Sequence, residues 1–388
     1  MMVTPGITVF LREQPDLVAG QRVGLVASAA SIDENLTGSA DLLHAHPDVQ
    51  LVALFGPEHG LRGSAQAGDH VSTYTDPRTG LPVYSLYGET QRPTAAMLEG
   101  IDTLIYDLQD GGVRFYTYLA TLINVMSAAA EYGRRVIVLD RPNPIAGRII
   151  EGLVLDPAYT SFVGPVEIPI RHGLTAGEMA RLCNEAFDIG CDLTVVPMRG
   201  WRRSMWFDDT GLPFVPPSPN LPTLSALQVY PGTCLIEGSN LSEGRGTTKP
   251  FEYIGAPWID AETLADDLNS LDLPGVRFRP VYFTPTISKY QGELCGGVHM
   301  YVRDREVFRP VETTLHLIAR VRSLWPAEFS WRGPWSESGQ RPIDLLSGGA
   351  QVREHLDAGR PVSELVASWQ AGLEAFDRLR EGYFLYHD

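Results

Sequence analysis

The chain has 388 residues, and its 31 Lys and Arg residues against 47 Asp and Glu residues give a formal net charge of −16. This length predicts two domains, or one large domain with an appendage, and a hydrophobic content of 44% is enough for a sizeable core. The acidic charge, without any basic run, argues against nucleic acid or an anionic membrane surface as a partner. No apolar stretch approaches the roughly 18 residues of a membrane span, and no export signal is visible, so we expect a cytoplasmic protein unless a longer precursor carries a signal.

The first half of the chain alternates short apolar runs with helical stretches. The runs are rich in Val, Leu and Ile and span residues 22–28, 49–55, 81–86, 102–108, 135–140 and 193–198. They barely alternate in polarity, which is typical of strands covered on both faces. Helices are expected at 117–132 and 175–187, and Thr175 and Glu178 have the spacing of a capping box. This order predicts an α/β fold with a mostly parallel sheet.

The second half has a different texture. The proline-dense stretch 213–222 cannot form a helix or a central strand. We expect a strand at 228–237, a Gly-rich polar segment after it, and then a smaller α+β domain. Its elements are expected at 260–270 (helix), 277–283 and 296–302 (strands), 311–323 (helix) and 362–380 (helix). The predicted domains are therefore 1–255 and 256–388.

The four cysteines are not spaced for a zinc site. Cys183, Cys191, Cys234 and Cys295 include no CxxC pair, and they are too few for a disulfide framework in a chain of this length. We expect buried free thiols and no metal.

Polar side chains follow three of the predicted strands, where each strand ends. Because an open parallel sheet binds its ligands beyond the carboxyl ends of its strands, these positions predict a site. They are Glu58 and His59 after the second run, Asp110, Arg114 and Tyr116 after the fourth, and Asp140, Arg141, Asn143 and then Glu151 after the fifth.

Each of these residues also has a structural interpretation. Glu58 and His59 could form a surface turn, an aspartate could cap the following helix, and Asp140 could hold Arg141. Arg114 could pair with Asp107 or Asp110. His172 could be a loop residue.

The common catalytic motifs are absent from the sequence. It contains no G-x-G-x-x-G after the first strand, no P-loop, no H-E-x-x-H and no G-x-S-x-G. Two chemistries remain: carboxylates acting as acid and base on a sugar, or Asp107, Asp110 and Asp140 gathered around Mg²⁺ for phosphoryl transfer.

At these loops the sequence resembles the exo-β-N-acetylmuramidases of the NamZ type. The matching segments are RVGLVAS, ALFGPEHGLRGSAQAG, TGLPVYSLYG, DLQDGGVRFYTY, VLDRPNPIAG with EG, SFVG, PIRHGLTAGEMA, PPSPNLPT, VYPGTCLIEGSNLSEGRGTTKPFEYIGAPW and FLYHD. The resemblance implies release of non-reducing terminal N-acetylmuramic acid from peptidoglycan fragments, as in wall recycling. It also implies a Rossmann-like domain with helices on both faces and a C-terminal domain that closes the cleft.

The resemblance leaves two other functions open, the metal-dependent phosphohydrolase and a non-catalytic muropeptide-binding protein. No cofactor is expected, and the partner is a small MurNAc-containing saccharide. The sequence leaves the oligomeric state open.

Glycoside hydrolysis needs a proton donor at the leaving oxygen and usually a second carboxylate. We assign the acid to Glu58, with His59 tuning it or holding the sugar. The second carboxylate could be Glu151, Asp140 or Glu243. In a third route the substrate's acetamido group attacks, oriented by Asp110 and Tyr116.

The lactyl carboxylate of the substrate needs a local cation in this acidic protein. We assign it to Arg245, with Arg114 as the second choice. Further candidates for sugar contacts lie in the matching segments; they are Arg62, Tyr116, Asp140, Arg141, Asn143, His172, Asn240, Glu243 and Thr247.

Overall fold

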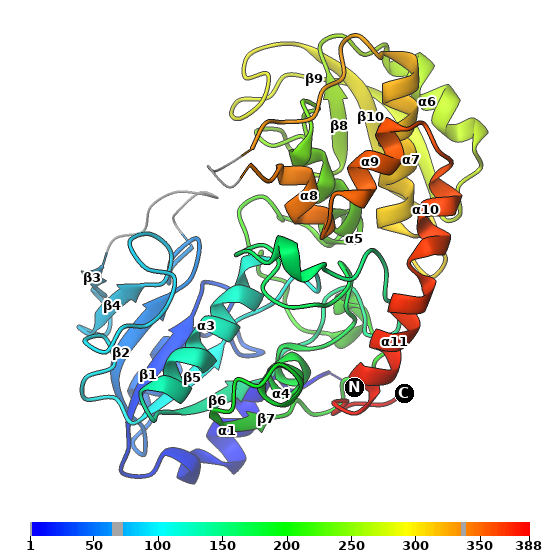
Figure 1. The fold of residues 1–388 in the computed structure, drawn as a ribbon. Helices are drawn as coiled ribbons and strands as arrows, with labels where there is room; N and C mark the ends of the chain where they lie inside the picture. Colours follow the sequence, from blue (N-terminus) through cyan, green and yellow to red (C-terminus); the bar gives the residue numbers. More distant parts are fainter. Residues whose placement is uncertain (1, 64–72, 335–338) are drawn as a thin grey trace. The chain divides into compact units, whose positions relative to one another are not determined.

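The computed structural model describes residues 2–63, 73–334 and 339–388 (Figure 1). The chain divides into two compact units, each assembled from separate stretches. Unit 1 comprises Met1–Ile149, Gly173–Pro219 and Arg378–Asp388, and unit 2 comprises Ile150–His172 and Asn220–Asp377. The predicted boundary at residue 255 falls inside strand β8 (Tyr253–Ala256), which belongs to unit 2 and pairs with a strand of its sheet, whereas the main division lies between Pro219 and Asn220.

Unit 1 contains a seven-stranded sheet in the order β3-β4-β2-β1-β5-β6-β7. The strands are β1 Arg22–Ala27, β2 Gln50–Gly56, β3 Tyr74–Thr75, β4 Pro82–Ser85, β5 Thr103–Asp107, β6 Arg135–Leu139 and β7 Asp192–Val196. All neighbours are parallel except the short edge strand β3, which the sequence did not predict. Without β3 the order is that of a Rossmann fold, whose ligands bind where the order reverses, here between β1 and β5.

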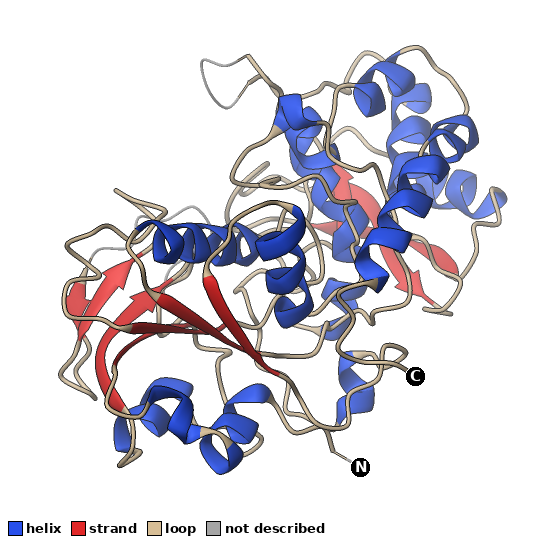
Figure 2. Cartoon of the chain, turned by 60° about the horizontal axis from the view of Figure 1, so that its bottom comes forward, coloured by secondary structure: helices blue, strands red, loops and turns tan. Residues whose placement is uncertain are grey.

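Helices lie above and beneath the strands of this sheet in Figure 2. The helices of unit 1 are α1 Gly6–Glu13, α2 Ser39–Ala45, α3 Thr117–Glu131 and α4 Ala176–Ala186, with the short 3₁₀ helices η1 Pro15–Val18 and η3 Phe207–Thr210. Because both faces are covered, all five residues of β5 are buried. The capping box at α4 is confirmed: Thr175 Oγ1 accepts from Glu178 N, and the Glu178 carboxylate accepts from Thr175 N.

Unit 2 is built on a three-stranded antiparallel sheet in the order β8-β10-β9. Its other elements are η2 Pro157–Tyr159, α5 Leu224–Thr233, η4 Cys234–Gly238, α6 Ala261–Ser270, β9 Val276–Phe283, β10 Cys295–Val302, α7 Pro310–Leu324, α8 Pro342–Ser347, α9 Gln351–Asp357 and α10 Val362–Ser368. Helix α11, Gln370–Glu381, begins in this unit. The predicted single helix at 362–380 is divided at Trp369.

The predicted strand at 228–237 is wrong, because this segment forms helix α5 and then η4. Its Val, Tyr and Ile residues suggested a buried strand. The segment is instead a helix that is apolar around most of its surface and packs against α7. Pro231 lies inside α5 and Gly232 follows it, and a Cβ at Gly232 would approach the carbonyl oxygen of Pro310 to 1.9 Å.

The four cysteines are free and buried, as predicted. Burial raises the pKa of Cys183 to about 12, so this thiol is an inert core side chain. In the described part of the chain, no helix combines the length and the hydropathy that crossing a lipid bilayer requires.

Candidate active site

Glu58 lies in a tight turn directly after β2. The turn depends on backbone geometry: a Cβ at Gly56 would approach Leu61 N to 2.8 Å, and Gly60 has a φ of 73°. His59 also has a φ of 73°, although it is not a glycine, and its side chain is buried. Such a conformation costs on the order of 1 kcal/mol and is maintained only where the surroundings impose it, often at functional sites.

Two hydroxyl groups hold the Glu58 carboxylate. Thr117 Oγ1, in the first turn of α3, donates to Glu58 Oε2 over 2.7 Å. Tyr87 forms a second hydrogen bond to this carboxylate; burial first, and then Glu58, raises the pKa of Tyr87 to about 12. Both hydroxyls can donate or accept, so they hold Glu58 in either protonation state. Neither Thr117 nor Tyr87 is predicted as a site residue from the sequence, although both lie in segments that carry the family resemblance.

Asp110 lies in the loop after β5, on the other side of the switch point. Its Oδ2 accepts from Gly112 N over 2.8 Å. Gly112 has a φ of 79°, and a Cβ there would approach Asn143 Oδ1 to 2.5 Å, so the loop requires glycine. Gln109 Nε2 donates to Pro142 O over 2.9 Å and joins this loop to the loop after β6.

Tyr118 lies close enough to both carboxylates for each to influence its hydroxyl. Its hydroxyl lies 3.4 Å from Glu58 O and donates to Pro217 O over 3.0 Å. Burial raises the pKa of Tyr118 far above its usual value, and the negative charges of Glu58 and Asp110 raise it further. Tyr116 packs edge-on against Tyr118, with 4.8 Å between ring centroids. Unit 1 therefore brings Glu58, Asp110 and two tyrosines together at the carboxyl edge of β2 and β5.

The three aspartates proposed for Mg²⁺ do not form a cluster. Asp107 forms a bidentate ion pair with Arg141, at 2.6 and 2.8 Å, and also accepts from Ser39 Oγ. Asp140 is fully buried and accepts from four internal donors. In the described ranges, no group of three His, Cys, Asp or Glu residues is arranged to hold a metal ion. The donor set for metal-assisted phosphoryl transfer is therefore not assembled here.

The three arginines of unit 1 that were candidates for binding the substrate are paired with carboxylates or buried within the protein. Arg62 pairs with the buried Asp76 over 2.9 Å and with Asp41 over 3.4 Å. Arg141 is committed to Asp107, as described above. Arg114 is fully buried, and desolvation lowers its pKa to about 9, which still leaves it protonated at neutral pH.

Arg245 of unit 2 lies in a compact charge cluster. Its guanidinium pairs with Glu237 over 2.6 Å and with Glu243 over 3.3 Å, and Lys289 pairs with Glu243 over 2.9 Å. Two cations thus meet two carboxylates, and a lactyl carboxylate would have to compete with Glu237. Its assignment to Arg245 stays a prediction.

The remaining unit 2 candidates have internal partners. Asn240 Nδ2 donates to Glu328 O over 2.8 Å, and Thr247 Oγ1 donates to Gly244 O over 2.6 Å, which shapes the Gly-rich turn. His172 is buried. No ligand contact is tested for these three, so their sugar-binding roles stay predictions.

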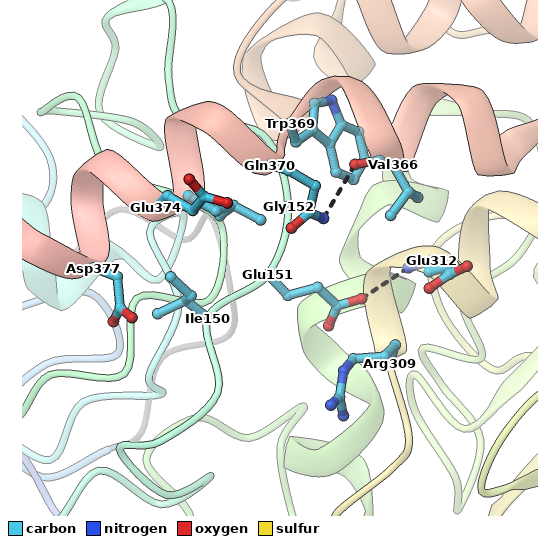
Figure 3. A pocket seen from close by; sticks show the side chains of 11 residues that line it. Ile150, Glu151, Gly152, Arg309, Glu312, Val366, Trp369, Gln370, Glu374 and Asp377 are labelled. Carbon is cyan, nitrogen blue, oxygen red and sulfur yellow. Dashed lines mark hydrogen bonds between the residues drawn. The ribbon is translucent and has the colours of Figure 1, made fainter.

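Glu151 lies at a pocket of about 320 Å³ in unit 2 (Figure 3). The pocket is lined by Ile150, Glu151, Gly152, Arg309, Glu312, Val366, Trp369, Gln370, Leu373, Glu374 and Asp377. Glu151 Oε1 accepts from Glu312 N in the first turn of α7 over 2.9 Å, so Glu151 caps this helix. Its Oε2 has no hydrogen-bond partner among the described residues. Burial raises the pKa of Glu151 from 4.5 to about 7.

This raised pKa predicts a pH-dependent effect of Glu151→Gln on stability. A carboxyl whose pKa is higher in the folded state stabilises the fold below about pH 4.5 and loses this contribution as the pH rises to about 7. The neutral amide does not titrate. The unfolding free energy of Glu151→Gln relative to wild type should therefore increase by about 3 kcal/mol between pH 4.5 and pH 8, measured by urea denaturation. If the difference in unfolding free energy between Glu151→Gln and wild type stays constant with pH, the pKa of Glu151 is not raised in the folded state.

Comparison with known proteins defines the class. Residues 23–225 match the N-terminal domain, and residues 228–386 the C-terminal domain, of the family described as exo-β-N-acetylmuramidase NamZ. The peptidoglycan β-N-acetylmuramidase NamZ of Bacillus subtilis is 50% identical over 384 residues, covering 99% of this chain and 91% of that protein.

Two crystal structures of DUF1343 family proteins from Bacteroides fragilis share the fold. One has a TM-score of 0.90 and 39% identity and covers 99% of both chains, and the other has a TM-score of 0.76 and 31% identity and covers all of both. The chain is thus a glycosidase. It belongs to the NamZ family of exo-β-N-acetylmuramidases.

Proposed function

We propose that this enzyme releases N-acetylmuramic acid from the non-reducing end of peptidoglycan fragments, with Glu58 as the general acid. Protonation of the leaving oxygen requires a carboxyl group fixed at the edge of a pocket or cleft. The observation that carries the proposal is the anchoring of Glu58 by Thr117 and Tyr87 at the carboxyl edge of β2, beside the switch point of the sheet.

Asp110 is the second carboxylate of this proposal. It follows β5, as Glu58 follows β2, and both carboxylates act on the same Tyr118 hydroxyl. In this route the acetamido group of the substrate attacks the anomeric carbon. Asp110 and Tyr116 orient that group, and Glu58 donates a proton to the leaving oxygen. The dispersed aspartates give no comparable support to phosphoryl transfer.

The test compares chromogenic β-glycosides of MurNAc and GlcNAc, which differ only in the lactyl group. We expect release from the MurNAc glycoside and at least 100-fold less from its GlcNAc counterpart. A site built to pair with the lactyl carboxylate has a cation that stays unpaired when GlcNAc binds. The same assay with EDTA should give unchanged rates. Equal turnover of the two sugars would contradict the substrate assignment, and binding of MurNAc without turnover would identify a binding protein.

A further inference from the structure

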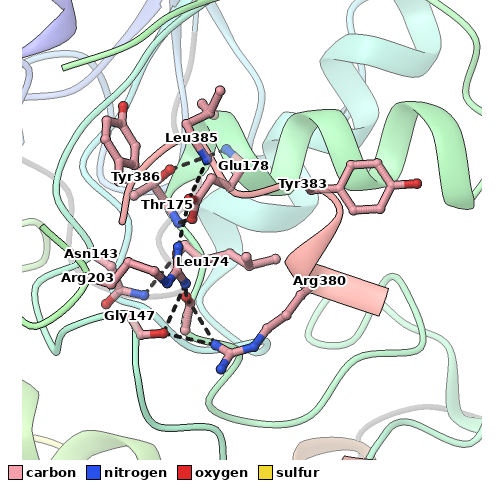
Figure 4. Close-up of polar contacts among 12 residues, drawn as sticks. Asn143, Gly147, Leu174, Thr175, Glu178, Arg203, Arg380, Tyr383, Leu385 and Tyr386 are labelled. Carbon is pink, nitrogen blue, oxygen red and sulfur yellow. Dashed lines mark hydrogen bonds and ion pairs between the residues drawn. The ribbon is translucent and has the colours of Figure 1, made fainter. Parts of the chain in front are cut away.

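The C-terminal residues of the chain are anchored in unit 1 by a dense set of polar contacts. Leu385 N donates to Glu178 Oε1 over 3.0 Å (Figure 4). The Arg203 guanidinium lies 3.5 Å from the centre of the Phe384 ring. Arg203 also pairs with Glu178 over 2.7 Å. Arg380, at the end of α11, donates to Gly147 O over 2.9 Å. Nothing in the proposed mechanism explains why this segment, FLYHD in the sequence, is held by so many contacts.

Tyr386 reaches from this segment to the end of β6. Its hydroxyl donates to Asp140 Oδ2 over 2.6 Å and accepts from Met198 N over 2.9 Å, and its ring packs edge-on against Trp201 at 5.1 Å. Both Tyr386 and Asp140 are buried, so solvent cannot replace this hydrogen bond.

Asp140 is the first residue of the loop that supports the Asp110 loop. Arg141, the next residue, holds Asp107, and Pro142 O accepts from Gln109. Asn143 packs against Gly112 so closely that a Cβ at this glycine would lie 2.5 Å from Asn143 Oδ1. A shift of Asp140 would therefore reach the loop that carries Asp110.

We propose that Tyr386 is a positioning residue of the active site, whose hydrogen bond to Asp140 fixes the loop 140–143 against the Asp110 loop. The inference rests on the proposed function, because it takes the Asp110 loop to be part of the site. It assigns a role in catalysis to the far C-terminal end of the chain.

The charges around Asp140 make the contact sensitive to pH. Burial is the dominant influence and raises the pKa of Asp140 to about 6, while Tyr386, Gly177 N and Thr175 favour the ionised form and nearby Glu178 opposes it. Arg203, which faces Glu178, offsets part of that opposition. Arg141 contributes its backbone N–H at 2.9 Å. Loss of the Tyr386 hydroxyl removes one donor to the carboxylate, so the pKa of Asp140 should rise.

The experiment measures kcat, KM and the pH profile of the full-length Tyr386→Phe enzyme on the chromogenic MurNAc glycoside. We expect kcat to fall about tenfold, as for the loss of one buried hydrogen bond to a charged group, with little change in KM. The acid limb of the kcat profile should move to higher pH. Tyr383→Phe is the matched control, since that side chain points away from the network in Figure 4, and it should behave as wild type.

A second variant keeps the test decisive if Tyr386→Phe folds poorly. Asp140→Asn retains an acceptor for Tyr386 but cannot titrate near pH 6, so its kcat profile should lack the acid limb assigned to Asp140. In this background, Tyr386→Phe should no longer shift the profile. A Tyr386→Phe enzyme with wild-type kcat and wild-type pH profile would overturn the inference while leaving the activity intact. A wild-type protein that does not turn over the MurNAc glycoside would instead refute the proposed function.

Discussion

Glu58→Gln should lower kcat on a MurNAc–GlcNAc disaccharide by about 10²–10⁴-fold, the contribution of a positioned general acid. The amide keeps the size of the side chain and an acceptor for Thr117, but it has no proton to give to the leaving oxygen. The sugar leaving group is a poor one, so its departure depends on that proton. The rate of sugar release under saturating substrate is the measurement.

The leaving group separates an acid from other roles of Glu58. With a dinitrophenyl aglycone, which departs without protonation, Glu58→Gln should retain most of the wild-type kcat for the glycosylation step. Glu99→Gln, an exposed glutamate of the same unit, is the matched control and should leave both substrates unaffected. Equal losses on the two substrates would show that Glu58 does not act as the proton donor.

Arg141→Ala should lower the unfolding free energy by about 3–5 kcal/mol, because it leaves the buried Asp107 carboxylate without its ionic partner. Asp107 is fully buried and Arg141 is 5% exposed, and two short hydrogen bonds join them. Among the residues that the structure describes, only the Ser39 hydroxyl would remain as a side-chain donor to Asp107. Urea denaturation at neutral pH measures the loss.

The sheet provides its own control for this prediction. Arg22 and Asp102 form an equivalent bidentate pair, but both side chains are exposed, so Arg22→Ala should cost far less. The double variant Arg141→Met with Asp107→Leu should recover much of the stability, since it removes both buried charges together. A similar loss for Arg22→Ala and Arg141→Ala would show that burial is not the source of the effect.

Local signals in the sequence determined most of unit 1. The six apolar runs became β1, β2, β4, β5, β6 and β7, and the capping box formed at Thr175, because each depends on residues within a few positions of one another. The parallel order then placed Glu58 and Asp110 beyond the carboxyl ends of their strands, which is why spacing alone made both of them candidates for a site.

The segment 228–237 shows where local signals fail. Its composition is compatible with a buried strand or a buried helix, and only its packing against α7 selects the helix. The place of β8 in unit 2 likewise depends on its pairing with β10, which no local pattern encodes.

The sequence by itself therefore determined the fold class and the family, and it indicated the edge of the sheet at which we propose the site. Only the tertiary structure decided which charged side chains there can contact a ligand. Arg141 forms an ion pair with Asp107, and Asp140 accepts a hydrogen bond from Tyr386 near the C-terminus. The physical reason is that hydrogen bonds and ion pairs join side chains 34 to 246 positions apart, and their geometry arises only when the chain has packed.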